Sequence, residues 1–192
     1  MSVTLHTSLG DVKVELACAE APKACFNFLA LAASGSYNGT IFHRNIPGFM
    51  IQGGGVFKQS SSSSSSSSSK VKWGESVWGD DFEDEFHPLL KHDARGVLSM
   101  ANKGPGGTNA RQFFFTYAPA PHLDSVYTAF GRIIHGLEFL DAAERVAPKA
   151  VVESAGKKKK SAARHRPEKD IVIESVTVHA NPLAQQRLPE NK

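Results

Sequence analysis

Hydrophobic and polar residues alternate along much of this chain, with the period of two that is typical of β-strands. Residues 2–17 contain two such runs with Gly10-Asp11 between them, which predicts a β-hairpin that turns at these two residues. In residues 171–178 the alternation slips at Glu174-Ser175, which indicates a β-bulge in a strand. The other predicted strands are residues 41–43, 49–53, 96–101, 112–117 and 127–134.

Two segments have the spacing of a helix instead. Pro22 suits the first turn of a helix, and Gly35 can end it. The apolar residues between them that repeat at helical spacing are Cys25, Phe28, Leu29 and Ala32. A shorter helix is predicted over residues 137–146, after Gly136. Many strands with two helices are typical of a barrel or a sandwich with helices at its ends, and composition does not choose between them.

Composition and charge exclude several classes of protein. The 192 residues, 41% of them hydrophobic, suffice for one domain with a sizeable core. A net charge of +3 does not require nucleic acid as a partner. No signal-peptide or membrane-spanning run is evident, so we expect no membrane association. Two cysteines, Cys18 and Cys25, are too few for a disulfide framework, and we interpret them as reduced, buried thiols of an intracellular protein.

Two segments do not fit a packed domain. Ten serines at residues 60–69 offer nothing apolar to bury, which predicts a disordered insertion over about residues 58–71. It is either a tolerated insertion or a tract that is phosphorylated or binds a partner. A second insertion, about residues 148–169, contains four consecutive lysines at 157–160. It is a solvated loop, a nuclear-import signal or an RNA-backbone contact. Direct nucleic-acid binding is not expected, because no aromatic residue interleaves with these charges.

Common catalytic motifs are missing from the sequence. Eight histidines form no HExxH pattern and the cysteines form no CxxC pair, so we expect no metal site. The glycine-rich residues 104–107 lack the Gly-Lys-Ser/Thr of a phosphate loop, and no Gly-x-Ser-x-Gly elbow exists. The acidic residues 83–85 lie between Phe82 and Phe86, which predicts a turn packed on the core. An arginine, amides and aromatic residues remain, and this set suits binding and non-covalent catalysis.

Residues 41–54, with the sequence IFHRNIPGFMIQGG, place one arginine and one glutamine among large apolar side chains. This segment resembles the signature of the cyclophilins, the peptidyl-prolyl cis-trans isomerases. Further segments resemble other cyclophilin blocks, namely GVLSMANKGP at 96–105, QFFFT at 112–116, and Leu123-Asp124 with Phe130-Gly131. The resemblance implies a mainly β fold, a closed eight-stranded antiparallel β-barrel capped by two α-helices. It implies one domain over residues 1–180, followed by a tail at 181–192.

The resemblance also implies an active site. Arg44 matches the family's catalytic arginine, and Gln52 matches the polar residue that orients it and contacts the substrate. The pocket that receives the proline ring is matched by Phe49, Met50, Phe114 and Leu123. The backbone edge that pairs with an extended peptide is matched by Ala101 and Asn102, and the same groove is lined by Gln112.

Three positions depart from the commonest cyclophilin pattern. His122 stands where many members have tryptophan, Tyr127 where many have histidine, and Lys103 where a small residue is common. We still expect His122 and Tyr127 to contact the substrate. The changes bear on drug affinity and substrate preference more than on the reaction, and we expect cyclosporin to bind weakly.

The expected activity is rotation about X-Pro bonds in peptides and proteins, without metal or organic cofactor. Amide resonance sets a barrier of about 18–20 kcal/mol to this rotation. The alternative is a proline-peptide-binding scaffold of an RNA-processing complex in which catalysis is incidental. The two ends of the chain, residues 1–7 and 179–182, resemble a small cyclophilin branch associated with the spliceosome. This implies spliceosomal proteins as partners, a role in folding or assembly, and a monomer in nucleus and cytoplasm.

Overall fold

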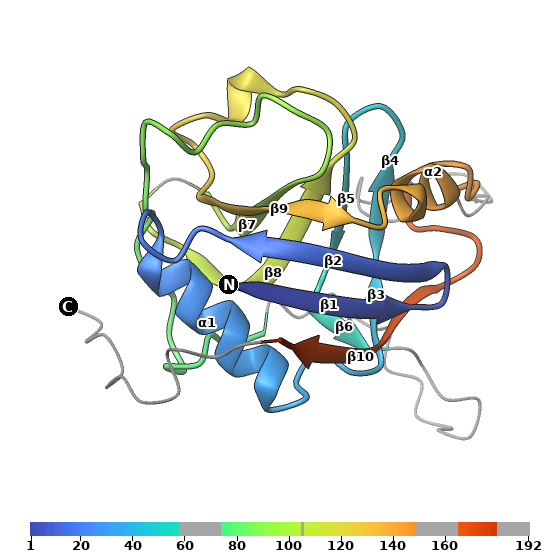
Figure 1. Ribbon diagram of the computed structural model, residues 1–192, viewed down its shortest axis with the longest axis horizontal. Coiled ribbons are helices and arrows are strands. Elements are labelled where there is room, and N and C mark those ends of the chain that lie inside the picture. Colours follow the sequence, from blue (N-terminus) through green and yellow to red (C-terminus); the bar gives the residue numbers. More distant parts are fainter. Residues whose placement is uncertain (58–73, 105, 149–164, 180–192) are drawn as a thin grey trace, which may run out of the picture.

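Ten antiparallel strands form one sheet that curls into a nearly closed barrel in the part of the chain that the structure describes (Figure 1). The structure is a computed structural model, and it describes residues 1–57, 74–104, 106–148 and 165–179. The strand order is β4-β5-β8-β7-β9-β2-β1-β10-β3-β6. The strands are β1 (Ser2–Thr7), β2 (Gly10–Leu16), β3 (Thr40–Phe42), β4 (Arg44–Ile46), β5 (Met50–Gly53), β6 (Val56–Phe57), β7 (Val97–Asn102), β8 (Asn109–Thr116), β9 (Ala129–His135) and β10 (Ile171–Val178).

The predicted fold class is confirmed, with two differences in detail. The structure has ten strands in place of the eight expected, and β4 and β6, of three and two residues, are too short for alternation to reveal them. The sheet also ends at β4 and β6 without pairing them. It closes where β5 passes close to β3. The approach is so close that a Cβ added to Gly53 would lie 2.8 Å from Phe42 Cδ1. Only a residue without a side chain allows this approach.

The N-terminal hairpin confirms one prediction and corrects another. Thr7 pairs with Gly10, so the turn consists of Ser8 and Leu9 and not of Gly10-Asp11. Gly10 begins β2 instead, with φ of +117°, a conformation that favours glycine. The predicted bulge is present, because His6 pairs with Ser175 and Thr7 with Ile173, which leaves residue 174 as the extra residue of β10.

Both predicted helices are present, at opposite sides of the barrel in Figure 1. Helix α1 (Pro22–Ala33) buries an apolar face against the barrel, and α2 (Glu138–Glu144) is shorter than predicted. The N-cap of α1 is Ala21, which cannot accept a hydrogen bond through its side chain. The Glu85 carboxylate does so instead, accepting from the backbone N–H groups of Lys23 (3.1 Å) and Ala24 (2.9 Å). A negative group at this end is favoured by the helix dipole.

Aromatic rings fill the interior of the barrel. Phe28 of α1 lies edge-on to Phe113 of β8, with ring centroids 5.2 Å apart and planes at 87°. The fully buried aromatic side chains are Phe28, Tyr37, Phe42, Phe82, Phe113, Phe115, Phe130 and Phe139. The predicted packing of both ends of the acidic turn is therefore half right, because Phe82 is buried and Phe86 is 49% exposed.

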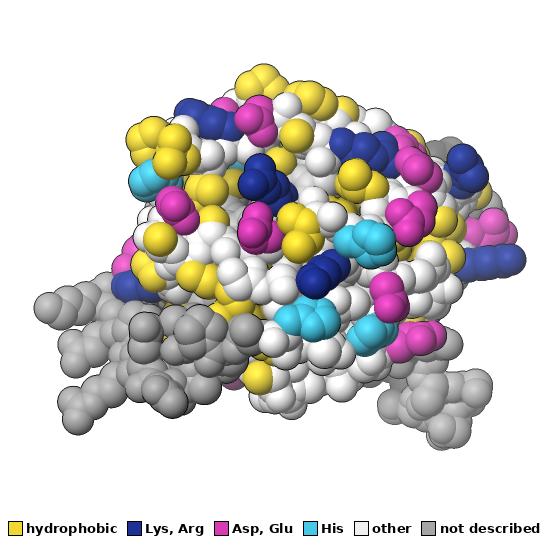
Figure 2. All heavy atoms as spheres, viewed as in Figure 1, with side chains coloured by type: hydrophobic (Ala, Val, Ile, Leu, Met, Phe, Trp, Pro, Cys, Tyr) yellow, Lys and Arg dark blue, Asp and Glu magenta, His cyan; other side chains and the backbone are white. Residues whose placement is uncertain are grey.

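The outer face of the barrel is polar, as the alternation requires. Figure 2 shows cationic, acidic and histidine side chains interspersed over the face formed by β9, β2, β1 and β10. On this face the His6 ring contacts Asp11 and Thr177, each at 2.9 Å. In the described part of the chain, no helix is long and apolar enough to cross a membrane.

The serine insertion, most of the basic insertion and the tail lie outside the described residues, so those predictions stay untested. The two ends of the basic insertion are described. Pro148 and Pro167 form an antiparallel bridge, and Glu168 N donates to Ala147 O at 2.8 Å. Arg166 pairs with Asp170 at 3.0 Å. The two ends of the insertion are therefore paired with each other where they leave and rejoin the barrel.

Candidate active site

The β4–β5 hairpin positions the two polar residues of the signature opposite one another. Arg44 pairs with Gln52 in its register, and Phe49 N donates to Ile46 O at 3.0 Å in the turn. The turn needs Gly48, whose φ is +75°. Side chains of paired residues lie on one face of the sheet, so the guanidinium and the amide emerge together.

A chain of side-chain hydrogen bonds orients the arginine. Arg44 Nη1 donates to Gln52 Oε1 at 3.4 Å, and Gln52 Nε2 donates to Gln112 Oε1 at 2.8 Å. Gln112 is completely buried, so the chain is anchored in the interior. Partial burial lowers the pKa of Arg44, but a guanidinium remains charged at any physiological pH. The long first bond uses one of five N–H donors, so the guanidinium can still bind a ligand.

A cavity of about 80 Å³ opens beside this arginine. Its volume is far below the roughly 300–1,000 Å³ of sites that bind whole small molecules, so it suits a single ring or side chain. The cavity is lined by Arg44, Phe49, Met50, Gln52, Ala101, Asn102, Phe114, Leu123 and Tyr127. We call it the Arg44 pocket. Its apolar floor is a separate buried cluster of Met50, Ala101, Phe114, Ala120 and Leu123.

The structure thus brings together all eleven residues predicted for the site. Nine line the pocket, and the other two contact the lining. Gln112 accepts a hydrogen bond from Gln52. The His122 ring stacks on Phe49 at the rim, with ring centroids 5.6 Å apart and planes at 25°. Tyr127 stands edge-on to Phe114, with centroids 5.6 Å apart.

An irregularity in β7 interrupts its regular strand pairing at the side of the pocket. The pairing of β7 with β8 shifts between Met100 and Asn102, which takes Ala101 out of the regular register. The pairing of β7 with β9 ends at Ser99. Peptide groups released from a sheet in this way can pair with an extended ligand. Asn102 is fixed there by its Nδ2, which donates to the Val126 carbonyl at 3.0 Å.

Residues that the sequence reasoning did not single out support the pocket from behind. His92 Nδ1 lies 2.9 Å from Asp124 Oδ1, and His92 Nε2 lies 3.1 Å from Ser99 Oγ. The His92 ring also stacks on Phe114, with planes at 10° and centroids 6.2 Å apart. We call His92, Ser99 and Asp124 the His92 cluster. Ser99 and Asp124 fall within segments that resemble cyclophilin blocks, but no spacing in the sequence links the three residues.

The His92 cluster has the residue types of a serine-hydrolase triad but not its accessibility. Ser99 is 0% and His92 is 1% exposed, so no substrate reaches the hydroxyl. Burial lowers the pKa of His92, which keeps the ring neutral and hydrogen-bonded. The cluster therefore acts as a buried polar network that fixes the back of the pocket.

A larger cavity, of about 430 Å³, lies on the other side of β9. It shares no residue with the Arg44 pocket, and its wall mixes acidic with basic side chains, among them Glu15, Glu20, Lys91, Asp93, Arg95 and Arg132. Within the described ranges, no group of three or more histidine, cysteine, aspartate or glutamate side chains is placed to hold a metal ion.

Comparison with known proteins agrees with this geometry. The family model of cyclophilin type peptidyl-prolyl cis-trans isomerases matches residues 2–178. Peptidyl-prolyl cis-trans isomerase CYP18-1 of Arabidopsis thaliana is 52% identical over 184 residues, covering 96% of this chain and 99% of the relative. Human peptidyl-prolyl cis-trans isomerase-like 3 is 49% identical over 185 residues, covering 96% of this chain and 100% of the relative.

A solved structure extends the agreement to three dimensions. The cyclophilin type peptidyl-prolyl cis-trans isomerase of Cryptosporidium parvum, crystallised in the presence of the dipeptide Ala-Pro, superposes with a TM-score of 0.74. It is 40% identical in sequence, and the match covers 94% of this chain and 100% of that chain.

Proposed function

This chain belongs to the cyclophilin family of peptidyl-prolyl cis-trans isomerases, and we propose that the Arg44 pocket is where it catalyses rotation about X-Pro bonds. The observation that carries the proposal is a permanent cation beside a cavity sized for one ring, with apolar walls. The proline ring enters between Phe49, Met50 and Phe114, and the preceding residues pair with the backbone at Ala101.

The mechanism follows from the electronic structure of the amide. In either planar form the prolyl nitrogen shares its lone pair with the carbonyl, and at the twisted transition state the lone pair is localised on nitrogen. Arg44 donates to that nitrogen, so it binds the twisted state more strongly than either planar state, which is the requirement for catalysis. Gln52 holds the guanidinium in place. A proline ring bound against the apolar residues displaces water from the cavity, which strengthens this hydrogen bond.

The first prediction tests this role of Arg44. We expect Arg44→Ala to lower kcat/KM for a proline peptide by about tenfold to a hundredfold, the loss of ~1.4–2.7 kcal/mol of transition-state stabilisation. Stability should remain near that of the parent, because the side chain is half-buried and lies outside both apolar clusters. Prolyl exchange measured by NMR and urea unfolding of the same samples check both parts.

Arg44→Lys is the matched control. Lysine keeps the charge but not the planar fork, so we expect activity between that of the parent and that of Arg44→Ala. A folded Arg44→Ala protein with unchanged activity would contradict the assignment of the pocket.

The biological setting that we propose is spliceosome-associated folding or assembly, in nucleus and cytoplasm. The support comes from the two ends of the chain, residues 1–7 and 179–182, which resemble the spliceosome-associated branch of the family. Tagged protein recovered from nuclear extract should retain spliceosomal small nuclear RNAs. Arg44→Ala separates the isomerase role from the scaffold alternative. If the protein acts as a scaffold, the variant should keep both its partners and its splicing function although catalysis is lost. If the isomerase activity is required, the variant should keep its partners but lose its splicing function.

A further inference from the structure

The only two cysteines of the chain are neighbours in the structure. Cys18 lies in the turn between β2 and α1, and Cys25 lies in the first turn of α1. The carbonyl oxygen of Phe130 in β9 draws these segments together, because it accepts from Ala17 N at 2.9 Å and from Cys25 Sγ at 3.4 Å. The shared carbonyl places the Cys25 sulfur beside the residue that precedes Cys18 in the chain. Nothing in the Arg44 pocket uses either thiol.

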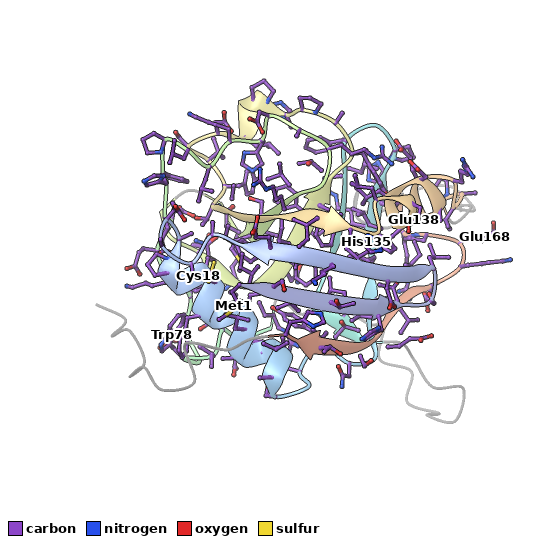
Figure 3. The ribbon with its side chains drawn as sticks, viewed as in Figure 1. Met1, Cys18, Trp78, His135, Glu138 and Glu168 are labelled. Atoms are coloured by element: carbon purple, nitrogen blue, oxygen red, sulfur yellow. The ribbon has the colours of Figure 1, made fainter. Side chains whose placement is uncertain are left out.

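The two thiols differ in accessibility and in acidity. Cys18 is half-buried and Cys25 is 0% exposed. Interaction with the Cys25 side chain lowers the pKa of Cys18, and the positive N-terminus of Met1 acts in the same direction. Figure 3 shows Met1 and Cys18 next to one another beside α1. The same interaction, together with burial, raises the pKa of Cys25. An accessible thiolate-forming cysteine beside a protonated, buried one is the arrangement of a reactive thiol with its resolving partner.

We propose that Cys18 and Cys25 form a reversible redox pair, in which a hydroperoxide oxidises Cys18 and Cys25 then closes a disulfide with it. In the first step the Cys18 thiolate attacks one peroxide oxygen. An S–O bond forms, the O–O bond breaks, and the leaving hydroxide takes up a proton to become water. Cys18 is now a sulfenic acid.

In the second step Cys25 sulfur attacks the sulfur of the sulfenic acid. The S–S bond forms, the S–O bond breaks, and the departing hydroxide takes the proton of Cys25 and leaves as a second water. Two thiols have together lost two electrons and two protons, and one hydrogen peroxide has become two waters. A cellular dithiol reverses the reaction by thiol–disulfide exchange.

The fold can accommodate the disulfide at little cost. Closing it removes the Cys25 hydrogen bond to Phe130, but the Phe130 carbonyl keeps its bond from Ala17, so no buried acceptor is left without a partner. The residue that has to move is Cys18, which lies between the two ends of the turn that stay bound, Ala17 to the Phe130 carbonyl and Ala21 to Cys25 N. The helix N-terminus stays anchored because Glu85 binds the backbone N–H groups of Lys23 and Ala24.

The test is peroxide treatment of the full chain, blocking of remaining thiols, and tryptic digestion without reduction. Cleavage after residues 13, 23 and 44 separates the two cysteines, so a disulfide joins peptide 14–23 to peptide 24–44. We expect this joined species to form, to appear faster as pH rises through neutrality, and to disappear on treatment with dithiothreitol. No joined species, a disulfide only between two chains, or sulfinic acid on Cys18 in its place would each overturn the proposal.

Matched variants assign the order of the steps. In Cys25→Ser and Cys25→Ala, Cys18 should accumulate as a sulfenic acid that dimedone traps, because its partner is missing. Two replacements are used because one of them could fail to fold at a buried site. In Cys18→Ser, the Cys25 thiol should remain unmodified at the same peroxide concentration. Oxidation of Cys25 in this last variant, at the rate seen in the parent, would reverse the assigned roles and overturn the proposal.

Discussion

The Arg44 pocket and the His92 cluster both contact one phenylalanine ring, Phe114, and use their polar residues in opposite ways. On the pocket side, Arg44 makes one long hydrogen bond of 3.4 Å and lines an open cavity. In the His92 cluster, His92 is bound at both ring nitrogens and only 1% exposed. The types of residue behind the ring are those of a hydrolase, yet His92 and Ser99 are buried, and the open cavity is on the pocket side. Accessibility, rather than residue type, separates a site from its support.

This comparison predicts that the two regions fail differently. Substitutions in the pocket should lower activity and spare stability, as expected for Arg44→Ala. Substitutions in the His92 cluster should do the reverse.

The largest effect is expected for His92→Leu. Leucine still covers Phe114, but it removes the two ring hydrogen bonds to Ser99 and Asp124, one of them to a carboxylate, which should destabilise the fold by about 2–4 kcal/mol. The remaining folded protein should keep activity within about threefold of the parent, or ~0.7 kcal/mol. Urea unfolding and prolyl exchange on the same samples provide the two readings. A stable variant with activity lost would place His92 in the chemistry instead.

A pH titration should separate the regions without mutation. Burial lowers the pKa of His43 from 6.5 to about 4, and it also lowers the pKa of His92. The unfolded chain therefore binds protons first as pH falls, so stability is fully present above about pH 6.5 and is lost towards pH 4. For His43 alone the loss at pH 4.5 should be about 2–3 kcal/mol. Arg44 does not titrate in this range.

His43→Gln is the control for this titration, because glutamine keeps a donor and cannot be protonated. Its free energy of unfolding should change less between pH 7 and pH 4.5 than that of the parent. Equal slopes for the two proteins would show that other groups carry the acid sensitivity.

A smaller effect is expected at the rim of the pocket. His122 stacks on Phe49 but covers less apolar surface than tryptophan and lacks the indole donor. His122→Trp should therefore bind cyclosporin about tenfold to a hundredfold more tightly than the parent, or ~1.4–2.7 kcal/mol. Isomerisation of short peptides should change less, because the residue lies outside the lining of the pocket. A tryptophan variant that binds no tighter in calorimetry would show that this position does not control the drug.

The smallest effect should come from a segment that belongs to neither region. Deletion of the ten serines at residues 60–69 should change the free energy of unfolding by less than about 1 kcal/mol, because loop-closure entropy varies slowly with loop length. The thermal midpoints of parent and deletion variant check this. A large drop would mean that the serines pack on the barrel.

Sequence patterns located much of the fold, and the family resemblance pointed to the residues of the candidate site. Alternation located most of the strands and the bulge of β10, because the side-chain period of a strand is local. Helical spacing located α1 and α2 for the same reason. The signature at residues 41–54 supplied Arg44 and Gln52 together, because they face each other across a short hairpin.

The tertiary structure alone decided the features that join distant residues. Glu85 caps α1 from about 60 positions away, and Ala101 leaves its register only because of how β7 meets β8 and β9. The His92 cluster joins three segments around Phe114, and the carbonyl of Phe130 joins Cys25 to the end of β2. Such contacts have no period along the chain. They depend on the closed barrel, because burial obliges each enclosed polar group to find a partner wherever the fold brings one.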